Sequence, residues 1–291
     1  MKRRTIERVF ASPRRHWVGN GFHVCNYFPR GARLFERFSP FILLDYNMPE
    51  EFPPARSPRG IGPHPHRGFE TVTFAFEGAV EHHDNKGNHG IIYPGDVQWM
   101  TAGGGILHKE YHEKEFSKKG GVFHVIQLWV NLPSKDKMTE PGYQALEASD
   151  MGIYRLEEKK GAVHVVAGEF KGVKGPARTF SPIHIYRAVL KEGALLILEE
   201  PKDFNLGLLV IQGDLEVNGQ KVNEYDFVLF DNVPGVVETK AMSEETQYMV
   251  FSGEDLKEPI VAGGPFVMNT REELMQANED FHQGKFGTSS F

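Results

Sequence analysis

The chain has 291 residues, of which 40% are apolar and 25% are charged, and its formal net charge at pH 7 is -6. This length allows one large domain or two ordinary ones, each with its own hydrophobic core. The negative net charge provides no general attraction to a phosphate backbone, so direct nucleic-acid binding is excluded from the expected functions.

The cysteine content and the apolar runs exclude further classes of protein. The single cysteine, Cys25, rules out an intrachain disulfide framework and a thiolate zinc cluster, and we expect it to be a small buried residue. The first residues lack the uninterrupted apolar region of a secretory signal peptide. No apolar run approaches the length of a membrane span. The sequence therefore predicts a cytoplasmic protein with no membrane partner.

Short strand-like segments, separated by Gly, Pro, Asn and Asp, follow one another along most of the chain. They cover residues 71–76, 90–93, 122–130, 163–166, 183–190, 194–198, 206–211, 228–230 and 248–251. Such close spacing is typical of a β-sandwich or barrel. The pair Asn218-Gly219 predicts a type I′ hairpin turn. Only residues 270–282 predict a clear helix, with Thr270 as its cap, so the predicted fold class is mainly β.

A weak internal repeat suggests that the chain contains two copies of one β unit. The segment FEGAVE at 76–81 resembles IQGDLE at 211–216, and a turn and a second strand follow each of them. A polar segment at 149–160 lies between the two copies. We therefore expect one domain over residues 1–150 and a second over residues 151–291, the second including the terminal helix.

Two short motifs predict a metal site in the first domain. They are His64-Pro-His66 and, about forty residues later, His108-Lys109-Glu110. On a strand, side chains two positions apart share a face, so two strands can direct three imidazoles and a carboxylate at one metal ion. Two histidines with one carboxylate form the facial triad of non-haem iron sites. A third histidine leaves about two of six octahedral positions open for substrate or dioxygen.

A helical zinc-protease site is the alternative interpretation of the second motif. It would use His108 and His112, which share a face if this segment is helical. That motif needs a glutamate directly after the first histidine, whereas Glu110 comes two positions later. Residues 103–105 are three glycines, which lower helix propensity. The strand interpretation is therefore favoured.

The second domain lacks the histidine motif. The His-x-His pair lies fourteen and twelve positions before Gly78, and the same counts before Gly213 lead to Glu199 and Pro201. We therefore expect the second domain to share the fold and to bind no metal.

Several sequence blocks in the same order resemble the pirin family of the cupin superfamily. They are HPHRGFET at 64–71, PGDVQWMTAGGGILHKE at 94–110, IQLWVNL at 126–132, KMTEPGYQ at 137–144 and GPFVMNT at 264–270. The resemblance implies two jelly-roll β-sandwich barrels, with one divalent transition metal in the N-terminal barrel. Iron is the first expectation for that metal, and zinc, nickel, copper or manganese are alternatives. The family's ligands match His64, His66, His108 and Glu110 position for position.

Many other cupins use as fourth ligand a glutamate four residues after His-x-His, which here is Glu70. Glu70 has the strand parity of His66, but on a straight strand it would lie about 13 Å further along. Glu110 is therefore the preferred ligand, and Glu70 is expected beside the site or in a buried salt bridge. Lys109 has the opposite parity to the ligands and should point away from the metal.

The resemblance implies two alternative functions that share this motif. The first is a flavonol dioxygenase of the quercetin 2,3-dioxygenase type, with a flavonol and dioxygen as substrates and Glu110 as the base that removes the 3-hydroxyl proton. The second is a non-catalytic, metal-dependent regulator that binds a protein partner, either a transcription factor or a metabolic enzyme. Four residues on flanking strands could line a substrate pocket or belong to the barrel core: Phe74, Met100, Gln127 and Trp129.

Overall fold

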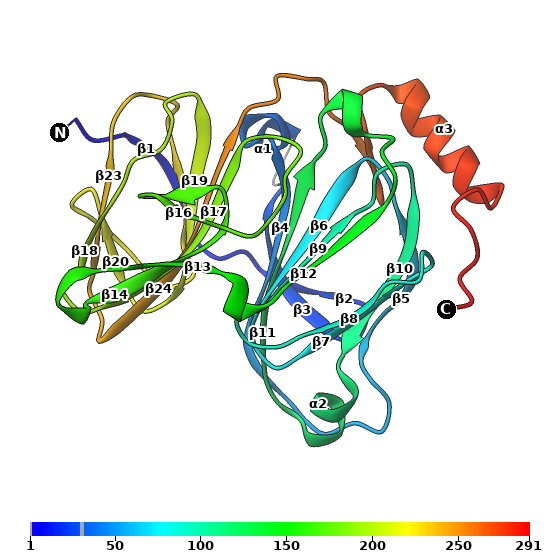
Figure 1. The fold of residues 1–291 in the computed structure, drawn as a ribbon, viewed down its shortest axis with the longest axis horizontal. Coiled ribbons are helices and arrows are strands. Elements are labelled where there is room, and N and C mark those ends of the chain that lie inside the picture. Colours follow the sequence, from blue (N-terminus) through cyan, green and yellow to red (C-terminus); the bar gives the residue numbers. More distant parts are fainter. Residues whose placement is uncertain (1, 30–31) are drawn as a thin grey trace. The chain divides into compact units, whose positions relative to one another are not determined.

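The computed structural model describes residues 2–29 and 32–291, which divide into two units. We call residues 14–36, 40–148 and 256–291 the first barrel, and residues 1–13, 37–39 and 149–255 the second barrel. Each contains a long and a short antiparallel sheet, as the mainly β composition predicts (Figure 1). Among the described residues, no helix has the length and apolar content that crossing a bilayer requires.

The first barrel contains a long sheet in the order β12-β9-β6-β11-β4-β3-β2 and a short sheet in the order β5-β10-β7-β8. Its strands are β2 (Arg15–Val18), β3 (Phe22–Phe28), β4 (Phe41–Phe52), β5 (Gly60–His66), β6 (Phe69–Glu77), β7 (Val80–Asp84), β8 (His89–Ile92), β9 (Val97–Thr101), β10 (Ile106–His112), β11 (Gly121–Asn131) and β12 (Gly142–Leu146). A separate hairpin joins β25 (Val261–Gly263) to β26 (Phe266–Met268). The helices are α1 (Ala32–Arg37), between β3 and β4, α2 (Lys114–Lys119) and α3 (Arg271–His282).

The second barrel repeats this arrangement strand for strand. Its long sheet has the order β1-β22-β19-β24-β17-β14-β13 and its short sheet the order β18-β23-β20-β21. These strands are β1 (Ile6–Phe10), β13 (Gly152–Arg155), β14 (Gly161–Ala167), β17 (Ile183–Lys191), β18 (Leu195–Leu198), β19 (Phe204–Gln212), β20 (Leu215–Val217), β21 (Gln220–Val222), β22 (Phe227–Phe230), β23 (Val237–Ala241) and β24 (Glu245–Glu254). Strands β15 (Glu169–Phe170) and β16 (Val173–Lys174) form a small hairpin beside them.

The sequence repeat marks the same corner in both barrels. Gly78 joins β6 to β7 and Gly213 joins β19 to β20, with φ of 80° and 69°, a backbone conformation that favours glycine. The Asn218-Gly219 pair joins β20 to β21 and has positive φ at both residues, as a type I′ turn requires. The repeat therefore reflects two copies of one topology.

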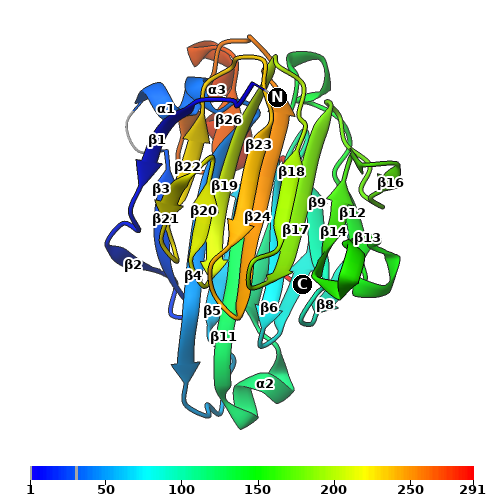
Figure 2. The same ribbon diagram turned by 90° about the vertical axis from the view of Figure 1, so that its left-hand side faces the viewer.

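The structure divides the chain differently from a single boundary at residue 150. Strand β1 pairs with β22 at the edge of the second barrel (Figure 2), in the place that β12 takes beside β9 in the first. Residues 256–291 pack on the first barrel instead of the second. The segment 149–160 is no simple linker, because it contains the edge strand β13, paired with β14. The physical reason for the first and third of these differences is that β22 and β14 would otherwise expose unpaired backbone groups at a sheet edge, and β1 and β13 pair with them.

Helix α3 forms where the sequence predicts it, and it closes one side of the first barrel. Thr270 caps the helix in a capping box with Glu273. The helix and the residues beside it bury an apolar cluster against β10 and β26, formed by Leu107, Phe266, Met268, Ala277 and Phe286. This packing explains why the terminal segment belongs to the first barrel.

A buried ion pair fastens α3 to the turn after β5. Arg67 Nη1 donates to Asp280 Oδ2 at 2.8 Å, and Arg67 Nε donates to the backbone oxygen of Gly104 at 2.8 Å. The guanidinium also lies 4.5 Å from the centre of the Phe286 ring. Because Arg67 directly follows His66, this contact fixes the end of β5 that presents the histidine pair.

We expect Asp280→Ala to lower the free energy of unfolding by about 3–5 kcal/mol, because it leaves the buried Arg67 charge unpaired. Hydrogen bonds from Lys285 and Arg67 hold the pKa of Asp280 well below its usual range. The stabilisation is therefore present at neutral pH and is lost as the pH falls below about 4. Urea denaturation checks this, with Glu279→Ala on the exposed face of α3 as the control. Equal losses in the two variants would contradict the assignment.

Candidate metal centre

Strands β5 and β10 bring three histidines together inside the first barrel. The two strands pair antiparallel, and His108 lies directly opposite His64. The ring centroids are 4.3 Å apart for His64 and His108, and 4.8 Å apart for His66 with either of the other two. One ring nitrogen from each residue lies within 4.8 Å of the others. The two sequence motifs therefore meet at one point.

The environment of these rings fits a metal ion. Burial lowers the pKa of all three histidines, and it does so most strongly for His66 and His108, where the neighbouring His64 further disfavours a positive charge. Neutral imidazoles offer the lone pairs that a transition metal needs. His108 Nε2 is buried without a hydrogen-bond partner. Burying a polar atom without a partner destabilises the fold by about 1–3 kcal/mol, and a bound metal would offset this cost.

Contacts behind the three rings orient the opposite nitrogen of each ring toward the centre. His64 Nδ1 donates to the backbone oxygen of Gly62 at 2.9 Å, and His66 Nδ1 to that of Pro265 at 3.4 Å. His108 Nδ1 lies 3.4 Å from His82 Nδ1. With Nδ1 protonated, Nε2 is free to bind a metal, as in metal sites whose ligands are held by their second nitrogen.

Glu110 faces the same interior, where three side chains donate to its carboxylate. Gln98 Nε2 and Thr73 Oγ1 approach Oε1 at 3.0 and 3.3 Å, and Gln127 Nε2 approaches Oε2 at 2.9 Å. An ionised carboxylate has about four lone-pair positions. One position on Oε2 therefore remains for a metal or a proton. Glu110 falls in one potential ligand group with His108 and His82.

His82 and Asp84 are site residues that the sequence motifs did not identify. On β7, His82 lies directly opposite Glu110 and Asp84 directly opposite His108. His82 Nε2 donates to Asp84 Oδ2 at 3.2 Å, which leaves His82 Nδ1 as an acceptor for two donors, Gln98 Nε2 at 3.3 Å and His108 Nδ1 at 3.4 Å. Asp84, His82 and His108 thus form a chain that ends at the orphaned nitrogen. The sequence signal for these two residues is their spacing of two positions, which places His82 and Asp84 on one face of a strand, and the structure shows that this face of β7 is buried.

We expect His82→Phe to lower metal affinity about 10- to 100-fold, because it removes the acceptor that orients His108. Phenylalanine keeps the ring that stacks on Tyr143 at 5.1 Å. Competition against a coloured chelator measures the affinity, and Tyr143→Phe, which preserves that stacking, should change it little. Unchanged affinity in His82→Phe would contradict this role, and a loss as complete as in His108→Ala would make His82 a ligand.

Glu70 lies away from the three histidines. It accepts a hydrogen bond from Thr101 Oγ1 at 2.7 Å, and burial raises its pKa to about 7. Strand β6 directs Thr73 toward Glu110, and alternation then places Glu70 on the opposite face. The parity shared with His66 does not apply, because the chain turns at Gly68, with φ of 88°, between β5 and β6.

Two of the four residues considered for substrate binding line a cavity beside the histidines. The cavity has a volume of about 220 Å³, and Gln127 and Trp129 are among its lining residues. Met100 packs instead in a separate cluster with Ala102 and Ile106. Phe74 lies on the face of β6 opposite to Thr73 and lines no part of the cavity. The apolar part of the lining consists of Val18, Phe22, Val24, Ile61, Val125 and Trp129.

A second carboxylate, Asp45, also lines the cavity and was missed by the sequence motifs. On neighbouring strands, Asp45 pairs with Gln127 and Gln127 pairs with Thr73. Thr73 pairs in turn with Gln98. A polar row thus crosses four strands of the long sheet. Burial raises the pKa of Asp45, although Asn26 donates to its Oδ1 at 2.7 Å.

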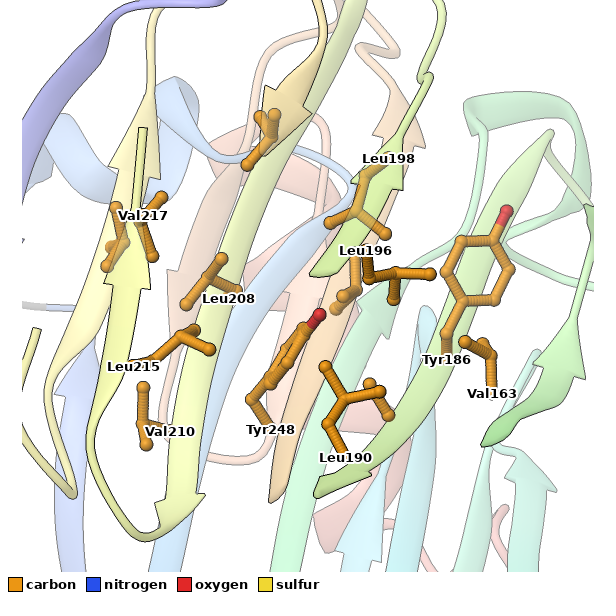
Figure 3. Close-up of a cluster of buried hydrophobic side chains, with 14 of the residues drawn as sticks. Val163, Tyr186, Leu190, Leu196, Leu198, Leu208, Val210, Leu215, Val217 and Tyr248 are labelled. Carbon is orange, nitrogen blue, oxygen red and sulfur yellow. The ribbon is translucent and has the colours of Figure 1, made fainter. Parts of the chain in front are cut away.

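The second barrel replaces this polar row with apolar side chains. The corresponding cross-strand row is Tyr186, Val250, Leu208 and Val228. All four lie in one buried cluster, part of which is drawn in Figure 3. In the described part of the chain, no potential ligand group lies in the second barrel.

The ligand positions of the first barrel are also apolar or neutral in the second. In the second barrel, the pair Leu198 and Val237 takes the place of His64 and His108. In the same way, the pair Thr239 and Val217 takes the place of Glu110 and His82. The counterpart of His64 is therefore Leu198, one residue before the Glu199 that counting from Gly213 suggested.

The structure excludes the zinc-protease alternative, because residues 106–112 form the strand β10. His112 lies among aromatic rings, 4.1 Å from Phe123 between ring centroids, and its Nε2 donates to the backbone oxygen of Gly21 at 2.7 Å. Lys109 points away from the histidines, and its Nζ donates to the backbone oxygen of Phe291.

Comparison with known proteins gives consistent matches over nearly the whole chain. Residues 21–130 match the family described as Pirin, and residues 185–287 match the Pirin C-terminal cupin domain. A Pseudomonas aeruginosa protein named "Putative quercetin 2,3-dioxygenase PA2418" is 47% identical over 96% of both chains. The Homo sapiens protein named Pirin is 37% identical over 88% of this chain and 86% of its own. A crystal structure described as quercetin 2,3-dioxygenase from Acinetobacter baumannii covers 99% of both chains, with a TM-score of 0.95 and 42% identity.

Proposed function

The chain belongs to the pirin family, and we propose that it is a metal-dependent dioxygenase of flavonols. The observation that carries this proposal is the group of three neutral histidines, two of which line a largely apolar cavity, beside a carboxylate with one open acceptor position. The names of the Pseudomonas and Acinetobacter relatives support the same substrate class.

In this proposal one divalent transition metal is held by His64, His66 and His108, with Glu110 as fourth ligand. Iron is the first candidate, because three nitrogens and one carboxylate with open positions suit a non-haem iron site. The affinity order of divalent metals allows zinc, nickel or copper to replace it, and manganese remains an alternative. When bound, the metal supplies Lewis acidity to the neighbouring 3-hydroxyl and carbonyl oxygens of the substrate.

Glu110 is the proposed base. Glu110 lines the cavity, and its one open position on Oε2 would hold the metal in the free protein and accept the 3-hydroxyl proton of a flavonol once the substrate oxygens take its place at the metal. Gln98, Thr73 and Gln127 hold the carboxylate in place while this proton moves. The ionised flavonol then reacts with one dioxygen, and the ring opens with loss of carbon monoxide.

The cavity suits the oxygenated edge of a flat aromatic molecule. Its volume of about 220 Å³ is below the roughly 300–1,000 Å³ of pockets that enclose a whole drug-sized ligand. The reacting ring would therefore enter, and the remaining ring would stay at the mouth beside the half-buried Val18, Phe22 and Ile61. The apolar walls would exclude water from the reacting ring.

A spectroscopic assay tests the proposal. Metal-replete protein mixed with quercetin under nitrogen should shift the quercetin absorption band without bleaching it, because chelation leaves the ring intact. Admission of oxygen should then bleach the band. A stable shifted band in oxygen, together with recovery of a stable protein partner from cell extract, would instead favour the metal-dependent regulator.

A further inference from the structure

A second group of potential metal ligands lies on the outer face of the short sheet of the first barrel. Side chains alternate along β7, so Glu81 and His83 face outward while His82 and Asp84 face the interior. His89 on β8 lies directly opposite His83. The two imidazole ring centroids are 4.1 Å apart.

The two histidines converge on one oxygen atom. His89 Nε2 lies 2.9 Å and His83 Nε2 lies 3.3 Å from Glu81 Oε1. One potential ligand atom from each of the three residues lies within 4.8 Å of the others. Their side chains are 14%, 30% and 49% exposed for Glu81, His83 and His89, so the group is open to solvent yet partly ordered by packing.

A third strand holds this group in place. Tyr111 on β10 lies directly opposite Glu81 and hydrogen-bonds to its carboxylate. The Tyr111 ring also stacks on the His83 ring, with centroids 5.9 Å apart and an angle of 16° between planes. The three potential ligands are therefore arranged before any metal arrives, which reduces the entropy that binding must overcome.

We propose that Glu81, His83 and His89 form a second metal site, which takes nickel, zinc or copper and completes its coordination with water. Two imidazoles and one carboxylate, with water in the remaining position, are a known ligand set for zinc. The affinity order of divalent metals favours nickel and copper at an exposed site that imposes little geometry. A cation would replace the two imidazole protons that now point at one carboxylate oxygen.

This site is weaker than the buried one. Lys109 lies directly opposite His83, and its positive charge opposes a cation bound there. Its Nζ is held by the backbone oxygen of Phe291, so it is not one of the converging groups. Protein dialysed without added metal should therefore keep only the buried ion, and the outer site should fill when metal is added.

Calorimetric titration of chelator-stripped full-length protein with nickel chloride tests the proposal. The wild-type chain should show two classes of site. His89→Ala and His83→Ala should each weaken the weaker class by at least about tenfold and leave the tighter class intact. His282→Ala, which removes an exposed histidine on α3, is the matched control and should change neither class.

The test separates this site from the proposed catalytic centre. His108→Ala should remove the tighter class and retain the weaker one, and His89→Ala loaded with one equivalent of metal should keep the flavonol activity of the wild type. The second site would be overturned if His83→Ala and His89→Ala still showed both classes of nickel-binding site. It would also be overturned if the wild-type chain showed a single class. Failure of the flavonol assay would not affect it.

Discussion

Replacing His108 with alanine is expected to abolish tight metal binding, and replacing His66 should do the same. Each change removes one of the three ring nitrogens that lie within 4.8 Å of one another, so the ligands that remain should bind the metal too weakly to hold it through dialysis. After exhaustive dialysis, elemental analysis should find about one transition metal per wild-type chain and almost none in either variant. This is the largest expected effect on binding.

His282→Ala is the control, because it removes a histidine far along the chain on α3. Circular dichroism should show that all variants keep the β fold. Retention of metal at the wild-type level in both His66→Ala and His108→Ala would contradict the assignment. A content near two per dialysed wild-type chain would contradict it as well.

Glu110→Gln should lower flavonol turnover by about 10²–10⁴-fold, the range expected when a general base is lost. Glutamine fits the same space, and the amide of Gln127 can rotate to accept from the new NH2 group. The change therefore removes the charge and the open acceptor position on Oε2 with little disturbance of packing. Metal affinity should fall together with turnover.

Glu70→Gln is the matched variant on the opposite face of β6. It keeps a hydrogen-bonding partner for Thr101 and should leave metal affinity and turnover nearly unchanged. Because burial raises the pKa of Glu70 to about 7, its ionisation destabilises the fold as the pH rises from about 4.5 through 7. The variant should therefore be more stable than the wild type above pH 7. Loss of metal in Glu70→Gln but not in Glu110→Gln would favour the ordinary cupin ligand set.

The histidine site could be predicted from the sequence because it depends on local alternation. His64 with His66, and His108 with Glu110, each lie two positions apart on one strand, so their shared face follows from strand geometry alone. The direct pairing of the two strands, with His108 opposite His64, belongs to the tertiary structure. The spacing of the motifs only suggests it.

Other features depend on which strands become neighbours. Asp45 belongs to β4, a long strand that the residue pattern did not reveal, and it reaches the cavity through its pairing with β11. The sequence leaves Phe74 open between the pocket and the barrel core, and only the observed face of β6 shows that it lies outside the cavity. Strand β1 joins the second barrel through pairing across more than two hundred residues, which no local pattern records.

The most direct test of the central claim is carbon monoxide released when metal-replete protein consumes quercetin in air. If the buried centre is a flavonol dioxygenase, gas analysis should find about one carbon monoxide per quercetin consumed, and almost none with His108→Ala or under nitrogen. Consumption of quercetin without carbon monoxide, or equal release by His108→Ala, would contradict it.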